Sequence, residues 1–284
     1  MRLAVIIPVY NEKATVVELV ERVLATPPPA MPGDGALCER LLVLVDDGSD
    51  DGTTGLVMEL ATRPEIHAEL HKRNQGKGAA LRTGFAKAIS LGADVLLVQD
   101  GDLEYSPDDH AAMIAPIFDG RADAVIGSRF LGQTHRVLYF WHSVANRIIT
   151  LVCNMCTNLN LTDIECCLKA MTRDVAVKIT IEEDRFGVEP EIVAKLSRLR
   201  RTPDGEIITD HAATSMRARI ESEIASELGK VERLGGKTST PPVVPLRIYE
   251  VPVSYAGRTY EEGKKITWRD GFSAMWCIVK YNLR

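Results

Sequence analysis

Two carboxylates separated by one residue are the side chains of this sequence best suited to chemistry. Asp100 and Asp102 follow the apolar run 95–98, with Gly101 between them. Placed after a buried strand, both carboxylates can face the edge of a cleft, and oxygen ligands of this kind suit Mg²⁺ or Mn²⁺. Such an ion would bridge and neutralise a diphosphate. A solvated Asp-Gly turn is the alternative interpretation of the same residues.

A second acidic pair follows another apolar run. Asp46 and Asp47 come directly after residues 41–45. A carboxylate at this place can accept hydrogen bonds from a ribose or a base edge, and it can also cap the next helix. Asp50 and Asp51 are better placed for capping, which leaves Asp47 for a ligand.

The segment Asn74-Gln75-Gly76-Lys77-Gly78 precedes a predicted helix. Small residues and a lysine at a helix N-terminus favour an anion nearby. The segment lacks the spacing and the Ser/Thr of a P-loop, and no G-x-G-x-x-G follows the first strand, which argues against a dinucleotide-dependent oxidoreductase.

Three dispersed cations are the candidates for holding phosphates. Arg129, Arg258 and Lys264 fall near predicted strand or loop ends. They would offset the acidic residues if they converged on a diphosphate, and they would be solvated surface charges if they did not. None of the six histidines shows metal-ligand spacing or a neighbouring nucleophile, so a Ser-His-Asp hydrolase is not supported.

The elements that must position these residues alternate along the chain. Apolar runs at 3–9, 41–45, 95–98 and 124–126 predict buried strands, and helical spacing of apolar residues marks 15–24 and 81–89. This alternation predicts an α/β fold with a mainly parallel sheet between helices. Each polar cluster follows a strand, and ligands bind at the carboxyl ends of strands in such sheets.

The second half of the chain is less regular. Residues 138–156 and 272–284 have amphipathic patterns, which suit either packing on the core or contact with a membrane surface. Residues 201–246 are polar and charged, and we expect an inserted surface arm that is partly helical near 213–230 and loosely ordered at its ends. Residues 247–253 return to a strand pattern.

Bulk composition narrows the class of protein. The 284 residues carry a net charge of −5 with a pI near 5.8, whereas a nucleic-acid binder usually has the opposite sign. No apolar run approaches the roughly 18 residues that cross a bilayer. No secretory signal precedes the first strand, so we expect a cytoplasmic protein in which the six cysteines are buried thiols. Zinc bound by Cys153 and Cys156 is the less favoured alternative.

The motifs together resemble glycosyltransferase family 2. The resemblance rests on an ordered set of segments: Ile7-Pro8-Val9-Tyr10-Asn11-Glu12, Asp46-Asp47-Gly48-Ser49, Asn74-x-Gly76-Lys77-Gly78, Asp100-x-Asp102 and Gly127-Ser128-Arg129-Phe130. The later segments Thr162-Asp163, 184–191, 250–255 and 257–260 are similar to the dolichyl-phosphate mannose synthase branch.

The resemblance implies a GT-A fold and an inverting transfer of a hexose from a nucleotide diphosphate sugar, GDP-mannose or UDP-glucose, to a polyprenyl or dolichyl phosphate. A single catalytic domain would span 1–284, with a nucleotide-sugar-binding half at 1–130 and an acceptor-side half at 131–284. Metal binding falls to Asp100 and Asp102, and catalysis to these two with Asp163 and Arg129. Phosphate binding on the acceptor side falls to Arg258 and Lys264. Donor binding falls to Pro8, Tyr10, Glu12, Val45, Asp47, Lys77, Asp100, Gly101, Asp102 and Arg129.

Other functions remain compatible with the sequence. The same donor chemistry could serve a soluble sugar or a protein acceptor, and a nucleotide-sugar-binding protein without turnover is a third alternative. Contact with the inner face of the membrane would be peripheral, through the amphipathic segments. A homo-oligomer is one arrangement that the sequence allows. The arm at 201–246 and the Cys166-Cys167-Leu168-Lys169 segment depart from the family pattern.

Overall fold

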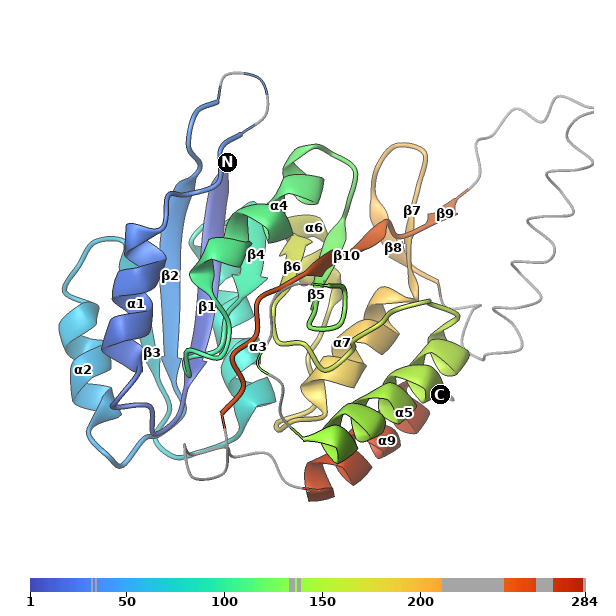
Figure 1. Ribbon diagram of the computed structural model, residues 1–284. Coiled ribbons are helices and arrows are strands. Elements are labelled where there is room, and N and C mark those ends of the chain that lie inside the picture. Colours follow the sequence, from blue (N-terminus) through green and yellow to red (C-terminus); the bar gives the residue numbers. More distant parts are fainter. Residues whose placement is uncertain are drawn as a thin grey trace, which may run out of the picture.

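A seven-stranded sheet forms the centre of the protein. The computed structural model describes residues 1–31, 33, 35–132, 136, 139–210, 243–258 and 268–282, without the side chains of 268–270. The strand order is β10-β5-β6-β4-β1-β2-β3 (Figure 1). β6 runs antiparallel to β4 and β5, and the other neighbours are parallel. The expected mixed, mainly parallel sheet is thus confirmed. The strands are β1 (Arg2–Val9), β2 (Glu39–Asp46), β3 (Ile66–Leu70), β4 (Val95–Val98), β5 (Ala124–Ser128), β6 (Lys169–Thr172) and β10 (Ile248–Pro252).

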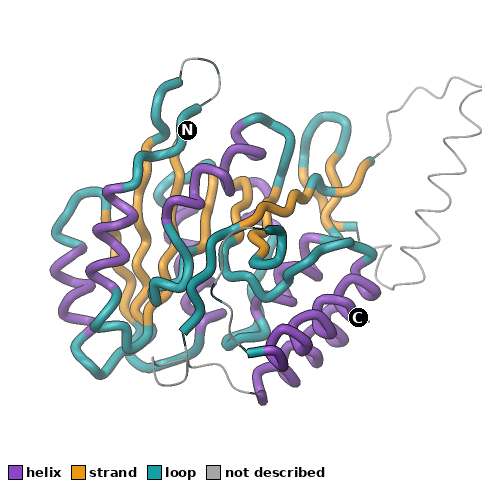
Figure 2. The backbone as a smooth tube through the Cα atoms, in the orientation of Figure 1, coloured by secondary structure: helices purple, strands orange, loops and turns teal. Residues whose placement is uncertain are grey.

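Helices cover both faces of the sheet (Figure 2). Successive side chains of β1 point to opposite faces, so Leu3, Val5 and Ile7 join one apolar core while Ala4 and Ile6 join the other. Each fully buried Leu or Ile side chain stabilises the fold by roughly 1.5–3 kcal/mol. The first core is closed by α1 (Val16–Ala25), α2 (Thr53–Leu60) and α4 (His110–Phe118), which follows the 3₁₀ helix η1 (Pro107–Asp109). The second is closed by α3 (Lys77–Ser90), α6 (Arg173–Lys178) and α7 (Val188–Leu196).

Both predicted amphipathic segments are helices, and they leave apolar side chains at the surface. α5 (Phe140–Thr157) and α9 (Trp268–Asn282) lie side by side beside α7 (Figure 1). α5 buries Ile149 and Cys153, so the face that contains Trp141 and Ile148 points outward. The helix therefore packs on the core along one side, where Val152 and Cys156 also contact it, and leaves Trp141 and Ile148 exposed. The large exposed apolar residues of the two helices are Phe140, Trp141, Ile148, Leu151, Met155, Phe272 and Trp276.

The ends of the predicted arm are strands, not loosely ordered segments. β7 (Leu199–Arg201) pairs antiparallel with β8 (Ile207–Thr209) and with β9 (Val244–Pro245). Ile207 is buried in the second core, and Arg201 Nη1 donates to Asp123 Oδ1 at 2.6 Å, which ties the small sheet to the domain. Residues 211–242, including the predicted helix near 213–230, lie outside the described residues.

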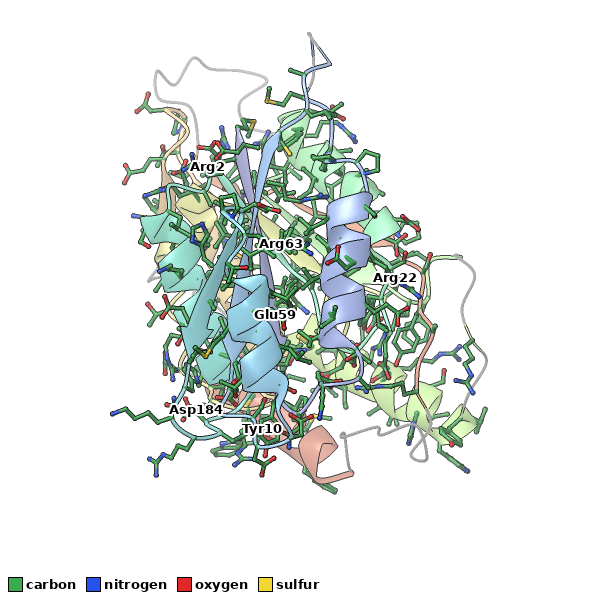
Figure 3. The ribbon with its side chains drawn as sticks, turned by 90° about the vertical axis from the view of Figure 1, so that its left-hand side faces the viewer. Arg2, Tyr10, Arg22, Glu59, Arg63 and Asp184 are labelled. Atoms are coloured by element: carbon green, nitrogen blue, oxygen red, sulfur yellow. The ribbon has the colours of Figure 1, made fainter. Side chains whose placement is uncertain are left out.

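The carboxyl ends of the parallel strands meet at one end of the molecule. In Figure 3, Arg2 at the start of β1 lies at the opposite end from Tyr10, which follows β1. Asp184, from the segment before α7, lies at the same end as Tyr10. β6 and β10, from residues 131–284, complete the sheet begun by residues 1–130. No helix within the described segments is long and apolar enough to cross a membrane.

Candidate active site

A cavity of about 1300 Å³ opens at the carboxyl ends of the strands. It gathers residues from the loops after β1, β2, β4 and β5 and from α5, α7 and α9. Arg258, from the segment after β10, also lines it. Val45 does not, because its side chain is fully buried in the second core. Lys264 lies outside the described residues. The predicted residues that line the cavity are Pro8, Tyr10, Glu12, Asp47, Lys77, Asp100, Gly101, Asp102, Arg129 and Arg258.

The Asp100–Asp102 pair lies in a tight turn after β4. A Cβ at Gly101 would meet Val9 Cγ1 at 2.7 Å, so only glycine lets the turn lie against the end of β1. Leu103 has φ 63°, a left-handed conformation that is costly for a non-glycine residue. The backbone is therefore held in an unfavourable conformation directly after Asp102.

Asp102 lies in a strongly acidic part of the wall. Burial, together with the charges of Asp100 and Glu104, raises its pKa to about 7, although Arg258 acts in the opposite direction. Arg258 Nη2 lies 3.0 Å from Asp102 Oδ2 and 3.4 Å from Glu12 Oε1. The Arg258 backbone N–H donates to Glu104 Oε1 at 2.7 Å. One arginine thus joins Asp102, Glu12 and Glu104, and Arg258 lies beside the acidic pair.

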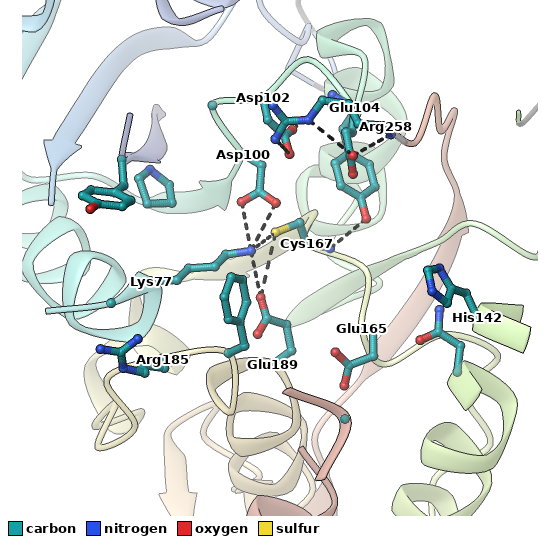
Figure 4. A pocket seen from close by; sticks show the side chains of 18 of the residues that line it. Lys77, Asp100, Asp102, Glu104, His142, Glu165, Cys167, Arg185, Glu189 and Arg258 are labelled. Atoms are coloured by element: carbon teal, nitrogen blue, oxygen red, sulfur yellow. Dashed lines mark hydrogen bonds and ion pairs between the residues drawn. The ribbon is translucent and has the colours of Figure 1, made fainter. Parts of the chain in front are cut away.

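Lys77 links the acidic pair to α7. Its Nζ lies 2.9 Å from Asp100 Oδ1 and 2.9 Å from Glu189 Oε1, and it contacts Cys167 Sγ (Figure 4). Burial alone would lower the pKa of Lys77, but the charges of Asp100, Cys167 and Glu189 raise it well above its usual value. Lys77 is therefore a buried cation, and the anions nearest to it are carboxylates of the protein.

The glycines beside Lys77 serve packing. A Cβ at Gly76 would meet Asp184 O at 2.3 Å, and one at Gly78 would meet Glu183 O at 2.0 Å. The Ala79 N–H donates to Asp184 O at 3.1 Å, so this carbonyl uses one of the free amides at the N-terminus of α3. The segment before α7 therefore packs directly on the start of α3.

Asp47 holds a loop. Its Oδ1 lies 2.7 Å from His71 Nδ1 and accepts the Gln75 N–H at 3.0 Å, and its Oδ2 accepts the Gly76 N–H at 2.6 Å. A carboxylate has about four acceptor positions, so most of the capacity of Asp47 is used inside the protein. The expectation that Asp47 is left free for a ligand is wrong, although the residue reaches the cavity wall.

Arg129 is held by Asp163. Asp163 is fully buried, and its two oxygens accept from Arg129 Nε at 2.6 Å and Nη2 at 2.8 Å. The Asp163 N–H in turn donates to Glu250 Oε1 at 3.0 Å. Arg129 lines the cavity, and its guanidinium lies 5.2 Å from the centre of the Tyr255 ring. Asp163 is absent from the cavity wall, and its side chain contacts Arg129 there.

The acidic pair suits a hard divalent cation. Asp100 and Asp102 offer oxygen ligands only, and burial, followed by the charges of Asp100 and Glu104, raises the pKa of Asp102. Across the described segments no three His, Cys, Asp or Glu side chains form a metal-binding group. The protein part of such a site would be these two carboxylates.

Three acidic residues of the cavity wall, Glu104, Glu165 and Glu189, were given no role by the sequence motifs. Glu165 and Glu189 both line the cavity, from the loop before β6 and from the first turn of α7. Glu189 lies within the segment 184–191 that carries the family resemblance, and Glu165 follows Asp163 by two residues. That both side chains lie in the same cavity wall becomes visible only in the folded structure.

Comparison with solved structures places the fold among GT-A glycosyltransferases. Glucosyl-3-phosphoglycerate synthase from Mycobacterium tuberculosis, solved with Mn²⁺, UDP and glucosyl-3-phosphoglycerate, superposes with a TM-score of 0.59 and 14% identity. The match covers 99% of this chain and 80% of the synthase. The structure of the same synthase with UDP gives a TM-score of 0.60. At this identity the likeness concerns the fold alone, and the expected GT-A fold is confirmed.

The model of the family "Glycosyl transferase family 2" matches residues 4–180, more than half of the chain. The chain belongs to this family, as its motifs indicated.

Curated relatives within the family carry names of polyprenyl-phosphate sugar transferases. An undecaprenyl-phosphate 4-deoxy-4-formamido-L-arabinose transferase of Pectobacterium atrosepticum is 29% identical over 61% of this chain and 49% of its own length. A UDP-N-acetylglucosamine–dolichyl-phosphate N-acetylglucosaminyltransferase of Methanococcus voltae is 28% identical over 60% of this chain and 76% of its own length. The chain spans about half the length of the first of these relatives.

Proposed function

We propose that the protein transfers a sugar from a nucleotide diphosphate donor to a polyprenyl phosphate, with inversion at the anomeric carbon. The observation that carries this proposal is the two-sided wall of the cavity. One side carries the acidic pair with Lys77, Arg129 and Arg258, and the other is apolar, with residues such as Trp141, Ile149, Phe272 and Met275 from α5 and α9. Such a cavity suits a charged donor and a lipid-linked acceptor. The names of the relatives support the same acceptor class.

The proposed reaction requires the protein mainly to align the two substrates and to stabilise negative charge. An acceptor phosphate is already an anion at neutral pH, so alignment of the two substrates and stabilisation of the departing diphosphate supply most of the catalysis. Mg²⁺ or Mn²⁺ at Asp100 and Asp102 would neutralise that diphosphate. Arg129, held rigid by Asp163, and Arg258 would bind phosphate oxygens of the donor or the acceptor.

The exposed apolar surface of α5 and α9 supports contact with a membrane surface. Trp141, Ile148 and Phe272 are each more than half exposed and also line the cavity. The apolar side of the cavity therefore continues onto this surface. Apolar side chains on a surface helix can enter the boundary between head groups and acyl chains. We place the protein on the inner face of the membrane as a peripheral enzyme.

A soluble sugar or protein acceptor is the second candidate. Burial of both amphipathic helices in the core would have favoured it, and their exposed residues count against it. Mannose and glucose are the proposed sugars, and N-acetylglucosamine enters the test because the Methanococcus relative is named for it.

Transfer to a lipid phosphate tests the proposal directly. The protein is incubated with Mg²⁺, a polyprenyl phosphate and labelled GDP-mannose, UDP-glucose or UDP-N-acetylglucosamine, and label in the organic phase is counted. We expect transfer from one donor, and none to the free polyprenol, because the alcohol lacks the anionic nucleophile. Absence of lipid-linked label with all three donors would exclude the acceptor assignment for these sugars. Hydrolysis of a donor without transfer would favour a different acceptor.

Asp102→Ala is expected to abolish metal-dependent transfer while the protein stays folded. Asp119→Ala is the matched control, because Asp119 is an exposed aspartate that pairs only with its neighbour Arg121 in the described structure. Normal metal-dependent turnover by Asp102→Ala would overturn the assignment of the site.

A further inference from the structure

Two carboxylate oxygens in the cavity wall are buried without a hydrogen-bond partner. They are Glu165 Oε1 and Glu189 Oε2, and Glu189 is only 5% exposed. Buried carboxylate oxygens nearly always accept hydrogen bonds, because an unpaired one loses its hydrogen bonds to water and gains none from the protein. Both residues line the large cavity, so a ligand in that cavity can supply the missing donors.

The two carboxylates are neighbours. Figure 4 shows Glu189 directly below Lys77 and Glu165 between Glu189 and α5. After burial, the charge of Glu189 is the strongest influence that raises the pKa of Glu165, to about 7. The backbone of the loop that contains Glu165 is held in place, because the buried ammonium of Lys169 donates to Ile164 O at 3.3 Å and contacts Cys166 O. The pair is therefore a formed part of the wall.

Glu189 lies close enough to Asp100 for one donor molecule to contact both residues. Lys77 Nζ lies 2.9 Å from an oxygen of Asp100 and 2.9 Å from an oxygen of Glu189. The two carboxylate oxygens are therefore no further apart than twice that distance. In a donor whose diphosphate lies at Asp100, one oxygen atom separates the phosphorus from the anomeric carbon, so the sugar ring reaches the neighbourhood of Glu189.

Charge decides which part of the donor lies against these residues. A diphosphate would be repelled by two carboxylates and is attracted to Arg129 and Arg258 on the other side. A sugar ring is neutral and carries several O–H donors, and a carboxylate accepts such bonds strongly.

We infer that Glu165 and Glu189 form the subsite that accepts the hydroxyl groups of the transferred sugar and so determines which sugar is used. This inference rests on the proposed function, because it requires a nucleotide diphosphate sugar in the cavity. Glu189 contacts the hydroxyls nearest to the acidic pair, and Glu165 those on the side of α5. Neither residue acts as a base, since the acceptor phosphate is already an anionic nucleophile at neutral pH.

Calorimetric titration separates sugar recognition from diphosphate recognition. GDP-mannose, UDP-glucose and UDP-N-acetylglucosamine are each titrated with Mn²⁺ into the full chain, beside GDP or UDP alone. We expect Glu189→Gln and Glu165→Gln to weaken binding of the active donor about tenfold, because a charge-assisted hydrogen bond becomes a neutral one. Affinity for GDP or UDP should change less than twofold. Glu182→Gln is the control, because Glu182 belongs to the same region and its side chain is 53% exposed.

Monodeoxy analogues of the active donor identify the contact. Wild-type protein should lose about tenfold in affinity for the analogue that lacks the hydroxyl bound by Glu189, and Glu189→Gln should lose little more for that analogue. Equal loss for the donor and the bare nucleotide would assign Glu189 to the Lys77–Asp100 site and overturn the inference. Unchanged donor affinity with a fall in kcat would overturn it in favour of a base. Failure of wild-type protein to bind every donor would refute the proposed function instead.

Discussion

Removal of Asp163 should be among the most damaging single changes in the protein. Asp163 is fully buried, and its partner Arg129 has a side chain only 13% exposed. Asp163→Ala leaves the guanidinium buried and unpaired, and the loss of one partner of a buried ion pair costs about 3–5 kcal/mol. It also removes acceptors for the backbone N–H groups of Arg129 and Glu165, at 3.1 and 3.2 Å.

Urea unfolding followed by circular dichroism measures this cost, with the free energy extrapolated to water. Asp163→Asn should cost less than Asp163→Ala, because the amide oxygen still accepts one hydrogen bond. The double variant Arg129→Ala/Asp163→Ala should be less destabilised than the two single variants added together, because no charge is left alone. Asp119→Ala removes a surface ion pair and should leave the unfolding midpoint unchanged. A cost for Asp163→Ala below about 1 kcal/mol would refute the account of this pair, since exposed pairs have that value.

Three other changes test separate parts of the structure. His110→Gln should make stability less sensitive to acid, because burial, followed by the charge of Arg40, lowers the pKa of His110 from 6.5 to about 3. In wild-type protein the unfolded state therefore binds a proton that the folded state does not, and the free energy of unfolding falls as the pH drops from 6.5 to about 3. An acid-unfolding curve with the same slope in the variant would contradict this. Gly84→Ala should destabilise by about 1–3 kcal/mol in thermal unfolding, because the added Cβ would meet Ile6 Cγ2 at 2.4 Å, whereas an unchanged Tm would show that the core yields. Trp141→Ser/Phe272→Ser should lose sedimentation with anionic liposomes while it keeps donor binding, and unchanged sedimentation would exclude this surface as the membrane contact.

Strands buried on both faces could be predicted closely from the sequence, and strands with polar residues could not. The run 95–98 coincides with β4, because four apolar residues between turn residues leave little choice. β3 includes His67 and Glu69 and lies at the edge of the sheet, where one side is open to solvent. β6 begins with Lys169, a residue that the pattern would place outside the core. Its ammonium is buried because carbonyl groups of the preceding loop accept from it.

The sequence predicts which site residues lie at the strand ends, because each follows a predicted strand along the chain. The acidic pair, Lys77, Arg129 and Arg258 do lie in one cavity, since the strand ends meet there. The use of each side chain depends on residues far away in the sequence. Asp47 accepts hydrogen bonds from His71 and the Gln75–Gly76 amides, and Asp163 accepts them from Arg129, and neither set of contacts could be read from the sequence. Glu165 and Glu189 become a pair only in the folded chain.

A crystal soaked with Mn²⁺ and the nucleoside diphosphate of the active donor gives the most direct test of a divalent ion at the sheet edge. The anomalous signal of manganese locates the ion without reference to the phases of the protein. We predict one strong peak bound by the carboxylates of Asp100 and Asp102 together with diphosphate oxygens, with the nucleoside towards Pro8 and Tyr10. A manganese peak and a diphosphate bound elsewhere, with these two carboxylates still paired to Lys77 and Arg258, would contradict the account.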